Sequence, residues 1–323
     1  MCLLQSQSIT ARILTEVQPD TRFISRIHLP LDCTQFNNDY EILSSFSFVT
    51  HLNPISSSPL QTYGLMDLNE RVYKLIIANQ KFVPLTVFCL KSLGELNITN
   101  TSFYEFELDD NSIRTLPSEI ALRASSLKYL YVYDTPVAHL PEQIGKLKNL
   151  RVLELSNTGL LDLPNSIGDL SSLTHLLLPS NKLTSLPATL GNLPNLITVR
   201  IEINLQLRSV QSLNGLPKLQ TLHTHYCPIE RLPSNLPDLH LLYMHANNLT
   251  DLVNIRTLGN DTPMPKIFHF SKNRIHSVPP QIDLLDVTTL HDLFIRNNRF
   301  SITDLQTIAA QFKAKNPDLN LLY

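Results

Sequence analysis

Residues 150–172 read LRVLELSNTGLLDLPNSIGDLSS, and the stretches on either side repeat them with small changes. Residues 127–149 read LKYLYVYDTPVAHLPEQIGKLKN, and residues 173–195 read LTHLLLPSNKLTSLPATLGNLPN, so each copy is 23 residues long. Further copies start at Leu196, Leu219, Leu239, Pro265 and Leu290. Repetition at a period of about 20 to 50 residues is typical of chains in which each unit packs only on its neighbours. We therefore predict an elongated repeat domain.

The spacing of the leucines predicts how each copy folds. In the sequence x-L-x-L-x the two leucines point to one side of a short strand, and the x residues point to the other side. We expect the leucines to form the core and successive strands to lie parallel, about 4.8 Å apart. The x residues then form a face that is open to solvent.

The full repeat, L-x-x-L-x-L-x-x-N/T/C-x-L-x-x-L-P-x-x-I-x-x-L, resembles the leucine-rich repeat family over roughly residues 72–305. Its LPxxIGxL segment is similar to the intracellular subtype of Ras-suppressor-like scaffolds and their plant relatives. The resemblance implies an α/β solenoid, a right-handed leucine-rich repeat horseshoe with a concave parallel β-sheet. It also implies that the Asn, Thr or Cys after each strand points inward and bonds the backbone of neighbouring turns. This column contains Asn111, Thr135, Thr158, Asn181, Asn204, Cys227, Asn247, Asn273 and Asn298.

The ends of the chain should protect the open ends of the solenoid. We expect residues 1–70 to be an N-terminal cap or degenerate repeats, residues 71–305 to be the repeats, and residues 306–323 to complete a C-terminal cap. Leu305, Ile308 and Phe312 share one face of an amphipathic helix, and a short last strand follows. Among the early units, those from Val72 and Phe103 fit the repeat, whereas LGELNITNTSF at residues 93–103 reads as truncated or overlapping.

Bulk composition argues against several classes of partner. Lys plus Arg is 26 against Asp plus Glu at 28, a net charge of -2, so neither nucleic acid nor an anionic membrane surface is expected. No apolar run approaches the roughly 18 residues of a membrane span. The chain has no P-loop, Gly-x-Ser-x-Gly or HExxH motif, so we expect no enzyme and no cofactor.

The spacing of the cysteines indicates in which cellular compartment the protein is expected. Cys2, Cys33, Cys89 and Cys227 are scattered without a CxxC pair, which argues against a disulfide framework and for a reducing, cytoplasmic location. We also read no secretion signal at the N-terminus. Glycosylation-type triplets keep an extracellular or receptor-type domain open as the alternative. They start at Asn97, Asn100, Asn248 and Asn260.

The segment LQTLHTHYCPIERLP, residues 219–233, suggests a metal site at first sight. The repeat register places Cys227 in the inward column and His223 and His225 on the solvent side, so one ion cannot use all three. His245 and His269 join the two histidines on the concave face. A metal site, a pH-sensitive surface, a solvated face without function and a protein-binding patch are the alternatives, and the patch is favoured because aromatic residues and arginine are typical of interfaces.

The sequence therefore predicts a non-enzymatic scaffold that binds a protein partner on the concave face, in intracellular signalling. No metal ligand is predicted. The expected partner-binding residues are Tyr129, Tyr131, Tyr133, Arg200, His223, His225, Tyr243, His245, His269, Phe294 and Arg296.

Overall fold

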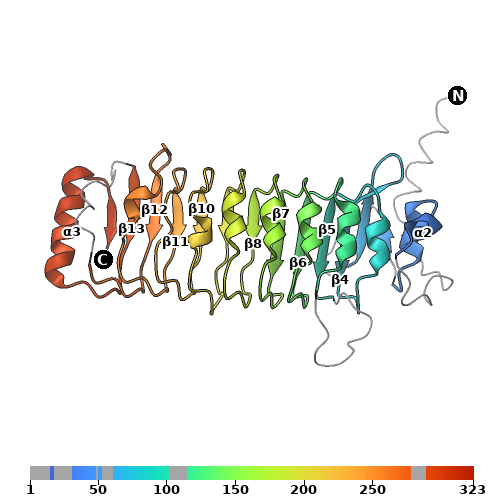
Figure 1. Cartoon of the computed structure of the whole chain (residues 1–323), viewed down its shortest axis with the longest axis horizontal. Helices are drawn as coiled ribbons and strands as arrows, with labels where there is room; N and C mark the ends of the chain where they lie inside the picture. The colour runs from blue at the N-terminus through green and yellow to red at the C-terminus, as the bar shows by residue number, and fades with distance from the viewer. Residues whose placement is uncertain (1–14, 18–30, 49, 53–60, 102–114, 278–288) are drawn as a thin grey trace. The chain divides into compact units, whose positions relative to one another are not determined.

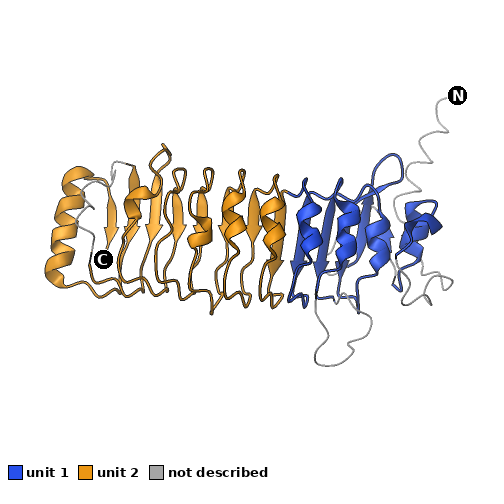
Figure 2. Ribbon diagram, in the orientation of Figure 1, with its two compact units in different colours: residues 1–150 blue, residues 151–323 orange. Residues whose placement is uncertain are grey.

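The computed structural model describes residues 15–17, 31–48, 50–52, 61–101, 115–277 and 289–323. They form two compact units, residues 1–150 and residues 151–323 (Figure 2). In both units short strands form a sheet, and short helical segments connect one strand to the next (Figure 1).

Unit 1 begins with a mixed sheet and continues as a parallel one. Its strands are β1 (Thr15–Val17), β2 (Thr50–Leu52), β3 (Tyr63–Met66), β4 (Val72–Ala78), β5 (Glu95–Thr99) and β6 (Tyr129–Tyr133). Its helical segments are η1 (Cys33–Gln35), α2 (Asp39–Ser44), η2 (Leu85–Cys89), η3 (Ser118–Arg123) and η4 (Glu142–Lys146). β1 pairs antiparallel with β2 and β3 antiparallel with β4, while β4, β5 and β6 are parallel. The antiparallel pairings involve strands β1 to β3 of the segment before residue 71, and the parallel pairing predicted for the repeats begins at β4.

The unit from Leu93, which reads as truncated, forms a complete strand. Leu96 and Ile98 of β5 are buried, and all five residues of β5 pair in register with β6. Thr101 fills the inward position, and its backbone N–H donates to Thr135 Oγ1 at 3.2 Å. The start of the Phe103 unit, including the predicted inward position Asn111, lies outside the described residues.

A disulfide joins Cys33 to Cys89, which are 56 residues apart in sequence. It connects η1, beside the N-terminal helix α2, to the end of η2 in the first repeat. The expectation that the chain lacks such a bond is wrong, because spacing along the chain does not show which cysteines meet in space. Cys227 is buried and free.

Unit 2 is a parallel sheet of short strands. They are β7 (Val152–Ser156), β8 (His175–Leu177), β9 (Thr198–Arg200), β10 (Thr221–His223), β11 (Leu241–Tyr243), β12 (Lys266–His269), β13 (Leu290–Phe294) and β14 (Asn320–Leu322). Its helical segments are η5 (Asn165–Asp169), η6 (Ala188–Asn192), η7 (Gln211–Leu213), η8 (Ile255–Thr257) and α3 (Ile302–Lys315). The central leucines Leu176, Leu222 and Leu242 are fully buried, so the predicted inward direction of these positions is confirmed.

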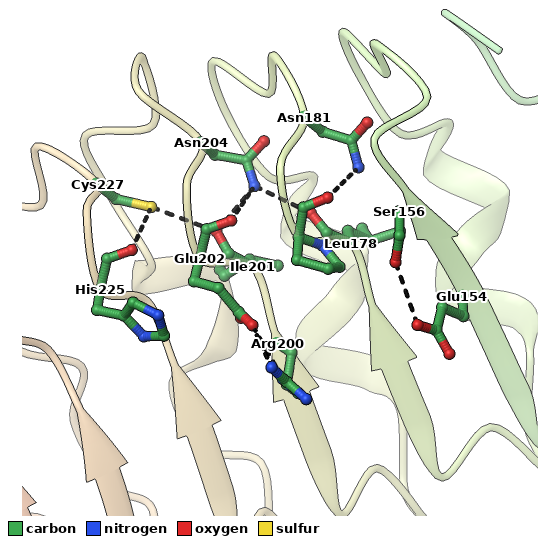
Figure 3. Close-up of polar contacts among 11 residues, drawn as sticks. Glu154, Ser156, Leu178, Asn181, Arg200, Ile201, Glu202, Asn204, His225 and Cys227 are labelled. Carbon is green, nitrogen blue, oxygen red and sulfur yellow. Dashed lines mark hydrogen bonds and ion pairs between the residues drawn. The ribbon is translucent and has the colours of Figure 1, made fainter. Parts of the chain in front are cut away.

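Buried asparagines tie each turn of unit 2 to its neighbours. Asn204 donates from Nδ2 to the carbonyls of Leu178 and Ile201 at 3.0 and 2.8 Å (Figure 3). Its Oδ1 accepts from the backbone N–H of Leu183 at 3.0 Å. The same kind of contact recurs at Asn181, Asn247, Asn273 and Asn298. We call these five residues the asparagine ladder. Because backbone groups away from water need partners, the ladder fixes the register of successive turns.

Cys227 takes the place of an asparagine in this ladder. Its Sγ lies 3.3 Å from the carbonyl oxygen of Ile201, and the side chain is buried, as its place in the repeat predicts. Burial raises the pKa of the Cys227 thiol to about 12, so it is uncharged at neutral pH. It therefore behaves as a small packed side chain.

The C-terminal end is covered by α3, which begins with a capping box between Ser301 and Asp304. Ile308 and Phe312 of α3 are buried and Leu305 is half-buried, which confirms the amphipathic face. The chain then returns to the sheet, where β14 pairs parallel with β13.

We expect Asn204→Ala to lower the free energy of unfolding by roughly 3 kcal/mol, because one buried N–H and two buried carbonyls lose their partner. Cys227→Ala is the matched control in the same column and should cost roughly 1 kcal/mol, because a thiol is a weaker hydrogen-bonding group. Urea unfolding followed by circular dichroism measures both. Equal losses would show that the ladder does not hold the turns together.

We also expect the disulfide to stabilise unit 1. Replacing Cys33 and Cys89 by Ser frees a loop of 56 residues in the unfolded chain, which costs about 4 kcal/mol in the chain-entropy estimate. Urea unfolding with and without reductant tests this. Reductant should destabilise the wild-type chain and leave the Cys33→Ser/Cys89→Ser variant unchanged; a wild-type chain that is insensitive to reductant would contradict the prediction.

Candidate functional site

Three histidine side chains stack on one another on the solvent side of the sheet in unit 2. The ring centroids of His225 and His245 are 4.6 Å apart, and the angle between the ring planes is 8°. The ring centroids of His245 and His269 are 4.4 Å apart, with an angle of 28° between the planes. All three rings are half-buried. We call His225, His245 and His269 the histidine stack.

Further aromatic rings extend the stack across neighbouring strands. His223 of β10, Tyr243 of β11, His269 of β12 and Phe294 of β13 are consecutive partners in the parallel register. The His223 and Tyr243 rings lie 4.5 Å apart, and those of His269 and Phe294 lie 4.8 Å apart. The predicted outward column therefore forms one continuous ring surface.

Arg200 and Glu202 form an ion pair at the β10 side of the histidine stack. Arg200 Nη2 lies 2.6 Å from Glu202 Oε1, and the Glu202 side chain is only 4% exposed (Figure 3). Glu202 favours the protonated form of His223 and His225, whereas Arg200 opposes it. The second carboxylate oxygen of Glu202, Oε2, is buried and has no hydrogen-bond partner among the described residues.

Burial keeps the stacked imidazoles neutral. It lowers the pKa of His245 to about 4, with further lowering from His269, His225, Lys272 and His223. Burial is also the largest cause of the lowered pKa of His223, His225 and His269. The Nδ1 atoms of His225 and His245 are buried and find no hydrogen-bond partner among the described residues. A protonated ring would need an acceptor at both nitrogens, so this arrangement also favours the neutral form.

The stacked geometry does not suit a metal ion. Imidazole nitrogens bind a metal through lone pairs in the ring plane, and in stacked rings these point side by side instead of toward one centre. Within the described ranges, no group of three or more His, Cys, Asp or Glu residues is placed to hold an ion. Cys227 lies on the opposite side of the backbone from the histidines, as the repeat register predicts.

The remaining predicted site residues lie in three places. Tyr129, Tyr131 and Tyr133 form a separate cluster on β6 in unit 1, where the Tyr131 and Tyr133 rings are 6.3 Å apart and nearly parallel. Arg200 is engaged with Glu202. Arg296 is exposed in the turn after β13.

Two exposed residues beside the stack, Tyr226 and Ile203, are not among the predicted partner-binding residues. Tyr226 is 48% exposed and packs edge-on against both His225 and His245, with ring centroids 5.7 Å away in each case. Ile203, one repeat earlier, is 41% exposed. Both have φ near +60°, which is costly for a bulky side chain. Their position in the repeat is the sequence signal that could have identified them. The same position of the turn also has a positive φ in other repeats, where it is occupied by Asn157, Ser180 and Ala246.

These features define a repeat solenoid with an aromatic sheet face. The sequence profile described as "Leucine-rich repeat region" matches residues 121–311, more than half of the chain. The chain therefore belongs to the leucine-rich repeat family, whose domains bind protein partners. No curated protein matches the sequence significantly.

Solved structures share the fold at low sequence identity. The plant peptide hormone receptor RGFR1 in complex with RGF2 is 23% identical, with a TM-score of 0.57 over 80% of this chain and 38% of the receptor. The leucine-rich repeat domain of the type III effector XopL is 22% identical, with a TM-score of 0.52 over 79% of this chain and 77% of that one. The chain thus spans well under half of the plant receptor. Across the described segments, no helix is long and apolar enough to cross a membrane.

We expect the neutral histidines to make stability depend on pH. The pKa of His245 is about 4 in the folded chain and near 6.5 when unfolded, so below about pH 6.5 the unfolded chain takes up a proton that the folded chain does not. The free energy of unfolding should therefore fall between pH 7 and pH 5, and His245→Phe should reduce that fall.

Exposed His276 provides the matched control, as His276→Phe. Thermal unfolding at several pH values measures the effect. A pH dependence that is the same in wild type and His245→Phe would contradict it.

Proposed function

We propose that the chain is a non-enzymatic scaffold that binds a partner protein on the solvent-facing strand surface of unit 2. The observation that carries this proposal is the continuous ring surface from His223 to Phe294, with exposed Tyr226 and Ile203 beside it. Leu205, in the same turn as Ile203, is 70% exposed. Apolar side chains gathered on one surface favour association, because a partner removes them from water.

The residues with nucleophilic side chains near this surface support a role without catalysis. Ser156 Oγ donates to Glu154 Oε1 at 3.1 Å, so it is not hydrogen-bonded to a histidine base (Figure 3). Cys227 is buried as an uncharged thiol whose pKa is raised to about 12. A nucleophile, a base and an orienting group would have to converge for acyl transfer.

The disulfide favours the extracellular or receptor-type alternative over the cytoplasmic signalling scaffold. Disulfides persist in oxidising compartments and are rare in the cytosol. The Cys33–Cys89 bond removes the argument from scattered cysteines on which the cytoplasmic location rested. The assignment to the intracellular LPxxI subtype stays a prediction. The plant peptide hormone receptor RGFR1 is in complex with RGF2, and a peptide partner is compatible with the strand surface of unit 2.

We expect Tyr243→Ala with His245→Ala to weaken partner binding at least tenfold, because residues near the centre of an interface carry most of the energy. The matched control is Asn192→Ala with Lys218→Ala, two exposed residues away from the strand surface. Affinity capture with quantitative mass spectrometry compares the three proteins. A protein that is retained by wild type and control but lost from the Tyr243→Ala/His245→Ala variant supports the proposal.

Equal capture of every protein by all three forms would remove the strand surface of unit 2 as the binding site.

A further inference from the structure

Four cations line the turns that follow β12 and β13. Lys272, Arg274, Arg296 and Arg299 are all exposed. None of them is in an ion pair with a described residue, in contrast to Arg200 and Arg208 earlier in unit 2. We call these four residues the basic edge.

Backbone contacts place the basic edge beside the histidine stack. The N–H of Lys272 donates to the carbonyl of Arg296 at 2.8 Å, so the two turns are adjacent. Lys272 also lies close enough to His245 and His269 to oppose their protonation. The N–H of Arg299 donates to the carbonyl of Ile275 at 2.7 Å, which places Arg299 beside the turn that follows β12.

Two carboxylates near this surface have other partners than the basic edge. Glu202 is engaged with Arg200 at the far side of the stack. Asp292 of β13 lies 2.9 Å from His291 Nδ1 and accepts from Asn320 Nδ2 at 2.6 Å. Among the described residues, the surface from the histidine stack to the basic edge therefore combines neutral rings with unpaired positive charge.

The dimensions of the ring surface suit one polypeptide segment. It is two outward positions wide on each strand, about 7 Å, and strands follow one another at about 4.8 Å. A chain that crosses several strands would cover this strip, whereas a globular partner needs about 800 Å² per side. Every second side chain of an extended peptide faces the surface on which it lies. Apolar side chains at some of these positions can contact the rings, while acidic side chains at others contact the basic edge.

We propose that this surface binds an acidic linear segment of a partner protein, with its carboxylates at the basic edge and its apolar side chains on the histidine stack. This inference rests on the proposed function and adds the chemistry of the partner. Charge complementarity raises the rate of association and selects among partners, while the rings supply the apolar contact.

Selection from a random linear peptide library displayed on phage tests the inference with the full chain immobilised. Peptides that bind are sequenced, synthesised and titrated against three proteins by fluorescence anisotropy. The first is wild type. The second is Lys272→Glu with Arg296→Glu, which reverses two charges of the basic edge. The third is Lys182→Glu with Lys218→Glu, a matched control with the same change of net charge at two exposed lysines elsewhere in unit 2.

We expect the selected peptides to be enriched in Asp and Glu together with aromatic or aliphatic residues. Charge reversal at the basic edge should weaken their binding roughly tenfold or more, and the control should change it less than about twofold, because surface charges act locally at physiological salt. Tyr243→Ala with His245→Ala should weaken the same peptides.

The other outcomes separate this inference from the proposed function. Some selected peptides could require Tyr243 and His245 for binding but carry no excess of acidic residues, or could bind wild type and the charge-reversed protein with equal affinity. Either result would overturn the inference of an acidic partner and keep the strand surface of unit 2 as the binding site. Peptides that ignore the Tyr243→Ala/His245→Ala change, or a library without binders, would overturn both. Tighter binding of a 20-nucleotide poly-dT strand than of any selected peptide would replace the acidic peptide with nucleic acid.

Discussion

The buried hydrogen bonds of the asparagine ladder determine which side chains of unit 2 reach solvent. Each asparagine meets backbone groups of its own turn and of the preceding one, so a shift of one residue would leave several buried groups without partners. Because strand side chains alternate, a fixed register at Asn204 and Asn247 also fixes the outward direction of His225 and His245. The same interaction that stabilises the solenoid thereby orients the side chains of its solvent-facing strand surface.

The histidine stack is a product of this register and of burial. Parallel strands bring the same position of successive repeats side by side, so similar residues in one column become stacked rings. Stacking excludes water, and the rings are held neutral by desolvation and by the charge of Lys272. A neutral aromatic strip beside exposed cations is a more specific surface than either feature alone, because a partner must satisfy both.

The sequence predicted those parts of the structure that depend on the spacing of leucines. The core positions, the outward columns, the inward place of Cys227 and the amphipathic C-terminal helix all follow from periodicity, and they are confirmed. Periodicity could not show that the unit from Leu93 contains a complete strand, since this unit reads as truncated in the repeat pattern. It could not reveal the Cys33–Cys89 bond, which depends on how the N-terminal segment returns to the first repeat. The roles of Tyr226 and Lys272 depend on turn geometry and on neighbours in adjacent repeats, which appear only when the turns are stacked.

The alternation of side chains along residues 222–227 is the central claim, and cysteine accessibility measures it most directly. Single cysteines would be introduced at Leu222, His223, Thr224 and His225 in a chain with Cys2 replaced by Ser and Cys227 by Ala, and treated with a thiol reagent under native conditions. Native Cys227 in the Cys2→Ser chain would be treated in parallel. The account predicts rapid labelling at positions 223 and 225, and labelling at 222, 224 and 227 only after unfolding. Similar labelling rates at all five positions, or protection at 223 and 225, would contradict it.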